Sequence, residues 1–190
     1  MSTTITPSVL TGEDLVTMPD DGIERDIIRG QLRERPMTRR NRRHSRTTAN
    51  LARLLGLWLQ NQPPLRGELL CGDAAFRLKA DPETTVGIDV AYISQERSAQ
   101  TADAAFLIEG PPVLAVEVLS PNDAHQDIVD KIALYLETGV AVVWIADPEL
   151  RTVTVHRNDS EPVLYSASQE LRGDPELPGF RVKVADLFSR

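Results

Sequence analysis

The stretch Val113-Leu-Ala-Val-Glu-Val-Leu119 is apolar on both of its alternating faces and carries one carboxylate, Glu117, near its centre. A strand of this composition is typical of the interior of a sheet that is covered on both sides. Burying an unpaired glutamate there would cost on the order of several kcal/mol unless a cation or hydrogen-bond donors bind its carboxylate. The stretch therefore predicts both the centre of the fold and a candidate site.

The residues that follow predict a parallel crossover. Asn122 or Asp123 is expected to cap a helix that runs to about Thr138 and ends at Gly139. A second continuous apolar strand follows at 140–146. A strand, a helix and a strand in this order favour a parallel pair of strands. Because both strands are apolar on both of their faces, helices are expected on both faces of the sheet.

The other segments predict a mixed sheet whose remaining strands are antiparallel. They comprise a short helix at 12–18, a hairpin at 23–28 and 31–35, a long helix from Arg43 or Ser45 to 61–64, strands at 69–71, 74–78 and 86–93, a meander at 152–157 and 163–165, and a closing segment at 180–188. We predict an α/β fold with a mixed β-sheet flanked by helices and with antiparallel hairpin extensions. Residues 1–12 are expected to form a flexible tail, and 13–190 a single domain.

Composition limits the compartment and the partners. No long apolar run is present, which predicts that the chain does not span a membrane. The first seven residues lack the pattern of a signal peptide. The single cysteine, Cys71, excludes an intramolecular disulfide, fits a reducing cytoplasm, and is expected in the core. A cytoplasmic protein is therefore predicted.

A second acid lies on a second apolar strand, in Val86-Gly-Ile-Asp-Val-Ala-Tyr-Ile93. The same-face neighbours of Asp89, Gly87 and Ala91, are small and leave room beside its carboxylate. On the following helix, Lys131 lies at the flank of the apolar stripe, from which its ammonium could reach past the end of the strand. Two carboxylates and a lysine suit Mg²⁺ or Mn²⁺ with a phosphate completing the ligand shell, as in a metal-dependent phosphodiesterase.

Residues 33–46 contain seven arginines and one acid, although the whole chain has a net charge of -7. Arginines ahead of a helix oppose its macrodipole, and bound phosphates would resolve that conflict. The cluster could instead be a solvated face, or an interface that recruits the acidic surface of a neighbouring subunit in a homodimer or larger homo-oligomer. His44 borders the cluster and could face a cleft or only solvent.

Four segments together resemble the Uma-two family of restriction-endonuclease-like proteins, which belongs to the PD-(D/E)XK nuclease superfamily. They are Gly87-Ile-Asp-Val-Ala-Tyr-Ile93, Leu114-Ala-Val-Glu-Val-Leu-Ser-Pro121, Asp130-Lys-Ile-Ala-Leu-Tyr-Leu-Glu-Thr-Gly-Val140 and Val143-Trp-Ile-Ala-Asp-Pro148. Asp26-Ile-Ile-Arg-Gly-Gln-Leu32 looks like a further element of the family. The resemblance implies a restriction-endonuclease-like fold, Asp89 and Glu117 as metal ligands, the Val118 carbonyl as a third ligand, Lys131 as a relocated catalytic lysine and Asp26 as an auxiliary acid.

The chain departs from the family pattern at several positions. Leu119 stands two residues after Glu117, where the superfamily places its lysine, so activity depends on Lys131. Ile88 replaces the usual proline, and Arg29 and Gln31 flank Gly30 where the family tends to have acids. These differences bear on catalysis and leave the fold assignment intact.

The leading hypothesis is an endonuclease that hydrolyses DNA phosphodiester bonds with Mg²⁺ or Mn²⁺. The residues expected to hold the DNA backbone are Arg39, Arg40, Arg42, Arg43, His44 and Arg46. The alternative is a catalytically inactive nuclease-like module that binds nucleic acid or a protein. Structural roles are also open: a buried Glu117 satisfied by an arginine or by backbone donors, Asp89 at a strand end, a snorkelling Lys131, and Asp26 in a hairpin ion pair.

Overall fold

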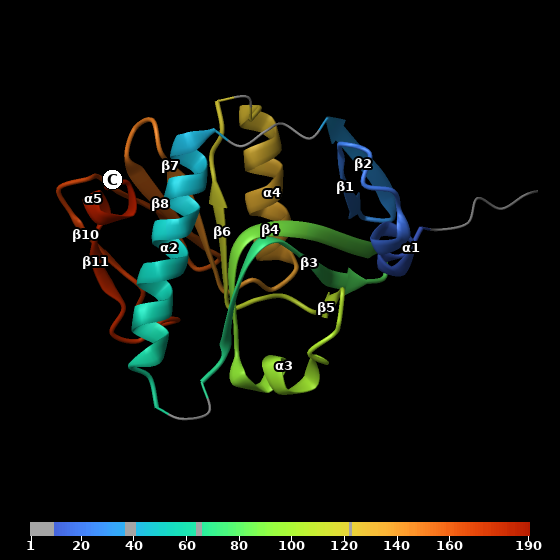
Figure 1. Cartoon of the computed structure of the whole chain (residues 1–190), viewed down its shortest axis with the longest axis horizontal. Helices are drawn as coiled ribbons and strands as arrows, with labels where there is room; N and C mark the ends of the chain where they lie inside the picture. The colour runs from blue at the N-terminus through green and yellow to red at the C-terminus, as the bar shows by residue number, and fades with distance from the viewer. Residues whose placement is uncertain (1–9, 37–40, 64–65, 122) are drawn as a thin grey trace, which may run out of the picture.

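The computed structural model describes residues 10–36, 41–63, 66–121 and 123–190, and Figure 1 shows the arrangement of its elements. The elements are α1 (Gly12–Thr17), β1 (Ile23–Ile28), β2 (Gln31–Pro36), α2 (Arg42–Gln60), β3 (Glu68–Ala80), β4 (Glu83–Ile93), α3 (Gln95–Gln100), β5 (Ile108–Glu109), β6 (Leu114–Val118), α4 (His125–Glu137), β7 (Val142–Asp147), β8 (Thr152–Arg157), β9 (Ser160–Tyr165), β10 (Glu170–Arg172), β11 (Arg181–Lys183) and α5 (Val184–Leu187). In this part of the chain, one mixed sheet has the strand path β2-β1-β4-β6-β7-β8-β9, with β3 on β4 and β5 on β3. The predicted α/β fold with a mixed sheet flanked by helices is confirmed.

The predicted crossover lies at the centre of this sheet. Strands β6 and β7 are parallel, with Leu114 opposite Val142 and Val118 opposite Ala146, and α4 connects them. The other pairs along the path are antiparallel, as expected. One short parallel pairing, between β3 and β5, was not predicted, because a strand of two residues gives no periodic signal.

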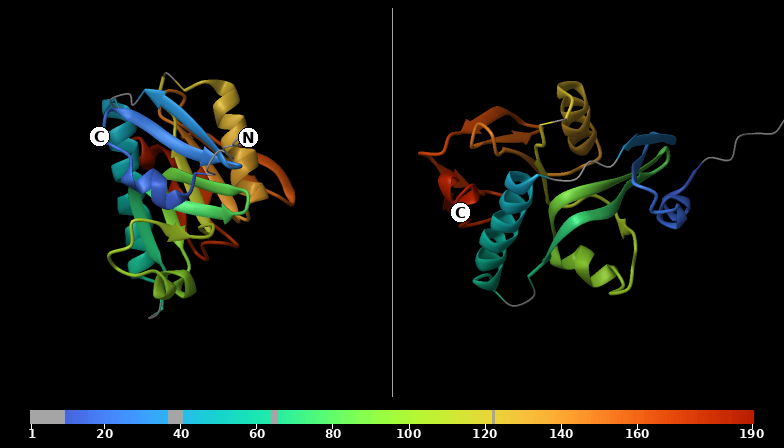
Figure 2. Two further views of the ribbon diagram at one scale, coloured as in Figure 1. Left: turned by 90° about the vertical axis from the view of Figure 1, so that its right-hand side faces the viewer. Right: turned by 45° about the horizontal axis from the view of Figure 1, so that its top comes forward.

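Alternation along β6 divides the core into two layers, and α2 and α4 lie on opposite sides of the sheet (Figures 1 and 2). Leu114, Val116 and Val118 point to the layer that α2 and the C-terminal segments cover. Ala115 points to the other layer, where Leu134 and Tyr135 of α4 pack. Since successive side chains of a strand alternate, Glu117 lies on the α4 side.

The long β3–β4 hairpin corrects two expectations. Segments 69–71 and 74–78 belong to one strand, which is interrupted by an irregularity in pairing between Cys71 and Ala74. There Gly72 and Asp73 have φ angles of 91° and 58°, so the alternation of side chains is broken. Cys71 is exposed, and its expected place in the core was wrong.

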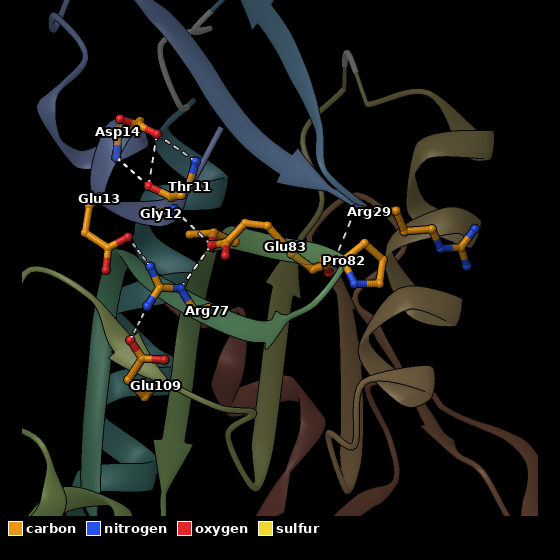
Figure 3. A network of polar contacts seen from close by, with 11 residues as sticks. Thr11, Gly12, Glu13, Asp14, Arg29, Arg77, Pro82, Glu83 and Glu109 are labelled. Carbon is orange, nitrogen blue, oxygen red and sulfur yellow. Dashed lines mark hydrogen bonds and ion pairs between the residues drawn. The ribbon is translucent and has the colours of Figure 1, made fainter. Parts of the chain in front are cut away.

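Helix α1 is fixed to the sheet by a network around Arg77 (Figure 3). The Arg77 guanidinium donates to Glu83 at 3.0 Å, to Glu109 at 2.6 Å and also to Glu13 of α1. The buried Glu83 carboxylate also accepts from the backbone N–H of Gly12 at 2.9 Å. Thr11 and Gly12, which the expected tail included, are therefore part of the folded structure, because Thr11 caps α1 and Gly12 contacts this carboxylate. Residues 1–9 lie outside the described residues.

Within the described ranges, no helix is both long enough and apolar enough to cross a membrane.

Candidate active site

The two acids predicted as metal ligands lie close to each other in the centre of the sheet. The pairing of β4 with β6 runs from Tyr92 and Leu114 to Val90 and Val116, and Asp89 and Glu117 follow directly beyond the last pair. Both acids line one cavity, and the charge of Asp89 raises the pKa of Glu117. The structure thus brings the two carboxylates together.

Helix α4 surrounds the Glu117 carboxylate with two donors. Lys131 Nζ donates to Oε2 at 3.1 Å, and the Tyr135 hydroxyl donates to Oε1 at 2.5 Å. Lys131 and Tyr135 are four residues apart and therefore lie on one face of the helix. The Lys131 and Glu117 side chains are each 15% exposed, so this ion pair is largely withdrawn from water.

This setting changes the acidity of all three groups. Burial raises the pKa of Glu117 to about 7, and the charge of Asp89 adds to that effect while Lys131 and Tyr135 oppose it. Burial lowers the pKa of Lys131, but the charge of Glu117 raises it by more, so the net pKa lies above its usual value. Burial and the adjacent Glu117 raise the pKa of Tyr135 well above its usual value. Near neutral pH, Lys131 is a cation, Tyr135 is a neutral donor and Glu117 is close to its titration midpoint.

Asp89 is held by the neighbouring strand. Its Oδ2 accepts from the backbone N–H of Val118 at 2.8 Å. His44 Nε2, at the start of α2, lies 3.3 Å from the same oxygen, in an orientation that does not form a hydrogen bond. Among the described residues, neither ring nitrogen of the buried His44 has a hydrogen-bond partner. His44 therefore faces the site rather than solvent, one of the two positions that the sequence left open.

The acids open into a cavity of about 250 Å³ between the sheet, the β1–β2 hairpin and the start of α4. Its lining includes Val118 as well as the charged residues. Its acids are Glu24, Asp89, Glu117, Asp123 and Asp127, and its cations are Arg35 and Lys131. Among the described residues, the lining thus contains more carboxylates than cations, and such an excess of acids favours a divalent cation.

The start of α4 departs from the predicted capping. The helix begins after Ala124, which makes no side-chain cap, and Asp123 instead accepts from the backbone N–H of Ser120 at 2.7 Å. Asp123 was therefore wrong as the cap, since a turn with Ser120 satisfies its carboxylate; Asn122 lies outside the described residues. The Asp123 carboxylate remains at the cavity.

The donor set fits a hard divalent cation. Two neighbouring carboxylates supply oxygen ligands, and Mg²⁺ or Mn²⁺ would complete its shell with water, a backbone carbonyl such as that of Val118, or substrate oxygens. Within the described ranges, no three side chains of His, Cys, Asp and Glu are arranged as metal ligands.

Asp26 lies near the site, since its charge raises the pKa of Lys131 and of Tyr135, but it is engaged by other partners. It is 3% exposed, its Oδ2 accepts from Arg35 Nη2 at 2.7 Å, and its Oδ1 accepts from the Gly87 backbone at 3.2 Å. It is absent from the lining of the cavity that holds Asp89 and Glu117. These contacts correspond to the hairpin ion pair that the sequence left as an alternative to an auxiliary acid.

The predicted arginine cluster lies partly beside the site. Arg39 and Arg40 lie outside the described residues, and Arg42 is exposed at the start of α2. Arg43 and Arg46 line a separate polar hollow of about 350 Å³, together with Arg151 and Arg190. Arg43 forms an ion pair with Glu149 there.

Two residues of the site were missed by sequence reasoning. Tyr135 was assigned to the apolar stripe of its helix, although its spacing of four from Lys131 could have indicated a shared partner. Arg35 was counted only within the arginine cluster. Its approach to the acids depends on how the hairpin folds over the sheet, for which the sequence contains no signal.

The mixed sheet with flanking helices defines the class of protein as α/β. The family model described as "Putative restriction endonuclease" (Uma2) matches residues 13–185, and the chain belongs to this family. A similar solved structure is described as a "putative nuclease belonging to DUF820 from Anabaena variabilis ATCC 29413"; it is 17% identical, with a TM-score of 0.77 over 94% of this chain and 97% of that chain. No curated protein matches this sequence.

Proposed function

We propose that the protein is a Mg²⁺- or Mn²⁺-dependent endonuclease that hydrolyses phosphodiester bonds of DNA. The observation that carries the proposal is the pair of neighbouring carboxylates, Asp89 and Glu117, in a cavity that also holds Lys131. Membership of a restriction-endonuclease family supports a nucleic-acid substrate.

Asp89 and Glu117 would hold the metal ion, which when bound supplies Lewis acidity and an acidified water. The neighbouring groups keep these ligands in place: the Val118 N–H holds Asp89, and the Tyr135 hydroxyl holds Glu117. Ligands that are fixed before substrate arrives need no reorganisation during the reaction.

Lys131 acts electrostatically in this proposal. Because its pKa is raised, the side chain is protonated at neutral pH and cannot serve as a general base. A fixed ammonium beside the cavity would instead orient the attacking water and stabilise the negative charge that grows on the phosphate. His44, whose buried Nε2 lies 3.3 Å from Asp89 Oδ2, would orient that carboxylate.

The DNA backbone would extend from the cavity toward the start of α2. Arg43 and Arg46, near the N-terminal end of this helix, line the polar hollow together with Arg151. Arginine binds phosphate oxygens bidentately, and backbone N–H groups at a helix start favour anions. Arg42 at the start of α2 belongs to the same proposed contacts, and the sequence adds Arg39 and Arg40, which lie outside the described residues.

The test is metal-dependent cleavage by Glu117→Ala beside a matched variant. Glu137→Ala is a suitable control, because Glu137 is also a glutamate that pairs with a cation, Arg29, but it is exposed on α4. We expect wild type and Glu137→Ala to cleave plasmid DNA in Mn²⁺, and Glu117→Ala to be inactive while keeping its circular dichroism spectrum. Equal nicking by all three proteins would contradict the proposal.

A second candidate function is a catalytically inactive module that binds nucleic acid or a protein. It is favoured by the direct pairing of Glu117 with Lys131 and Tyr135, which satisfies the carboxylate without a metal ion. Such a module would bind DNA in EDTA, with salt-sensitive affinity that Glu117→Ala leaves unchanged.

Self-association through the arginine cluster is a separate prediction. A homo-oligomer held by charge would dissociate between low and high salt, and light scattering would detect the change.

A further inference from the structure

Arg35 extends from β2 toward the candidate active site. Its side chain is 36% exposed and lines the cavity that contains Asp89, Glu117 and Lys131. It also lines the adjoining hollow of about 390 Å³ between the hairpin and α4. Burial lowers the pKa of Arg35, and the charges of Asp26, Glu24 and Glu117 raise it by more, which reflects its proximity to the acids.

Two carboxylates hold one end of the guanidinium. Nη2 donates to Asp26 at 2.7 Å and to Glu24 at 3.1 Å. Asp26 is buried and is tied through its other oxygen to the backbone of Gly87 in β4, so the anchor belongs to the sheet that carries Asp89. Among the described residues, every hydrogen bond of this guanidinium uses Nη2. Nη1 and Nε therefore remain as donors for a further partner.

The cations of the cavity indicate what that partner is. Among the described residues of its lining, the cations are Arg35 and Lys131, and Lys131 already pairs with Glu117. An anionic substrate thus requires a cation whose donors are not all used, and Arg35 has that property.

We propose that Arg35 binds the phosphate at the cleavage site and that Asp26 is a positioning residue, which holds the Arg35 guanidinium in the direction of that phosphate. The inference rests on the proposed nuclease function and extends it to a residue outside the metal-binding pair. With Nη2 held by Asp26 and Glu24, the planar guanidinium presents Nη1 in a fixed direction as a donor to a phosphate oxygen, an arrangement that the freely rotating ammonium of a lysine cannot reproduce. As charge grows on that oxygen during attack, the hydrogen bond strengthens.

The opposing explanation is that Arg35 only neutralises the buried Asp26. Arg25 offers a matched control, since it is an arginine of the same hairpin with two acidic partners, Asp21 at 2.7 Å and Glu34 at 3.0 Å. Its side chain is 12% exposed, and it is absent from the lining of the active-site cavity. A purely structural role predicts similar effects for Arg25→Gln and Arg35→Gln.

The experiment measures kcat/KM for cleavage of a labelled duplex in Mn²⁺, together with Mn²⁺ affinity by calorimetry, for Arg35→Gln, Arg35→Lys, Arg25→Gln and wild type. We expect Arg35→Gln to lower kcat/KM by roughly 100-fold, as for loss of one transition-state donor. Arg35→Lys should lower it about tenfold, as for one lost charge-assisted hydrogen bond. Arg25→Gln should remain within about threefold of wild type, and Mn²⁺ affinity should be unchanged or higher without Arg35, because a nearby cation has been removed.

Three results would overturn the role of Arg35. They are cleavage by Arg35→Gln within threefold of wild type, equal losses in Arg35→Gln and Arg25→Gln, and a loss of Mn²⁺ affinity that accompanies the loss of activity. If Arg35→Gln does not fold, the test is made with Arg35→Lys instead. Cleavage by Arg35→Lys at the wild-type rate would then overturn the inference. Absence of cleavage by the wild-type protein is a different outcome, which contradicts the proposed function itself.

Discussion

The ammonium nitrogen of Lys131 lies 3.1 Å from Oε2 of Glu117, fourteen residues earlier in the chain. The position two residues after Glu117 holds Leu119, so the strand that carries this acid provides no lysine at that place. Helix α4 provides one instead, because the parallel crossover returns the helix across the face from which Glu117 projects. The position of the cation thus depends on the packing of a helix against the sheet.

Lys131→Ala is predicted to impair cleavage more than metal binding. Removing the ammonium deletes a fixed positive charge beside the phosphate, which we expect to lower kcat by roughly 100- to 1,000-fold. It also removes the charge that lowers the pKa of Glu117, so this pKa rises further and the assay belongs at pH 8.5. Mn²⁺ calorimetry at that pH should show retained binding, and Lys79→Ala, an exposed lysine of β3, is the control. Full activity of Lys131→Ala would support the snorkelling role instead.

Metal affinity is predicted to depend on pH through Glu117. The pKa of this carboxyl is about 7 in the folded protein, so a proton competes with the metal ion below that value. Mn²⁺ affinity should therefore be about tenfold lower at pH 6 than at pH 8, and should level off above pH 7 to 8. Calorimetric titration at four pH values measures this directly. Affinity that changed only near pH 4 to 5 would show that Glu117 is not a ligand.

Arg77→Met is predicted to destabilise the fold. Arg77 connects Glu13 of α1, Glu83 of β4 and Glu109 of β5, and its loss leaves the buried Glu83 carboxylate without its cation. The expected decrease in the free energy of unfolding is about 3 kcal/mol, as for a broken buried ion pair. Arg29→Met, which breaks the exposed pair with Glu137, should cost less than about 1 kcal/mol. Urea titration of both variants tests this difference, and equal midpoints would contradict it.

The polar hollow at the start of α2 is predicted to contact the DNA backbone. Arg46→Gln combined with Arg151→Gln removes two of its cations while leaving the active-site cavity unaltered. If each contacts one phosphate, the slope of log affinity against log salt concentration should fall by about 2, without a change in sequence preference. Fluorescence anisotropy in Ca²⁺ measures the slope. Arg181→Gln, an exposed arginine on β11, is the control and should leave the slope unchanged.

Much of the candidate site could be predicted because its signals are local. A run of apolar residues with one acid marked β6, the same pattern marked β4, and the spacing on α4 put Lys131 beside the apolar stripe. Predictions failed where pairing between distant segments decides the outcome. The irregular pairing beyond Cys71 exposes this residue, and a turn with Ser120 engages the Asp123 carboxylate that was expected to cap α4.

The central strands of the sheet and the identity of the two acids beside them follow from the sequence alone, because apolar periodicity is a property of consecutive residues. The surroundings of those acids depend on tertiary contacts. The pairing of β4 with β6 placed Asp89 near Glu117, and the position of the β1–β2 hairpin brought Arg35 to their cavity. These contacts join segments far apart in the chain, and the free energy that selects them comes from packing and from charge neutralisation in three dimensions.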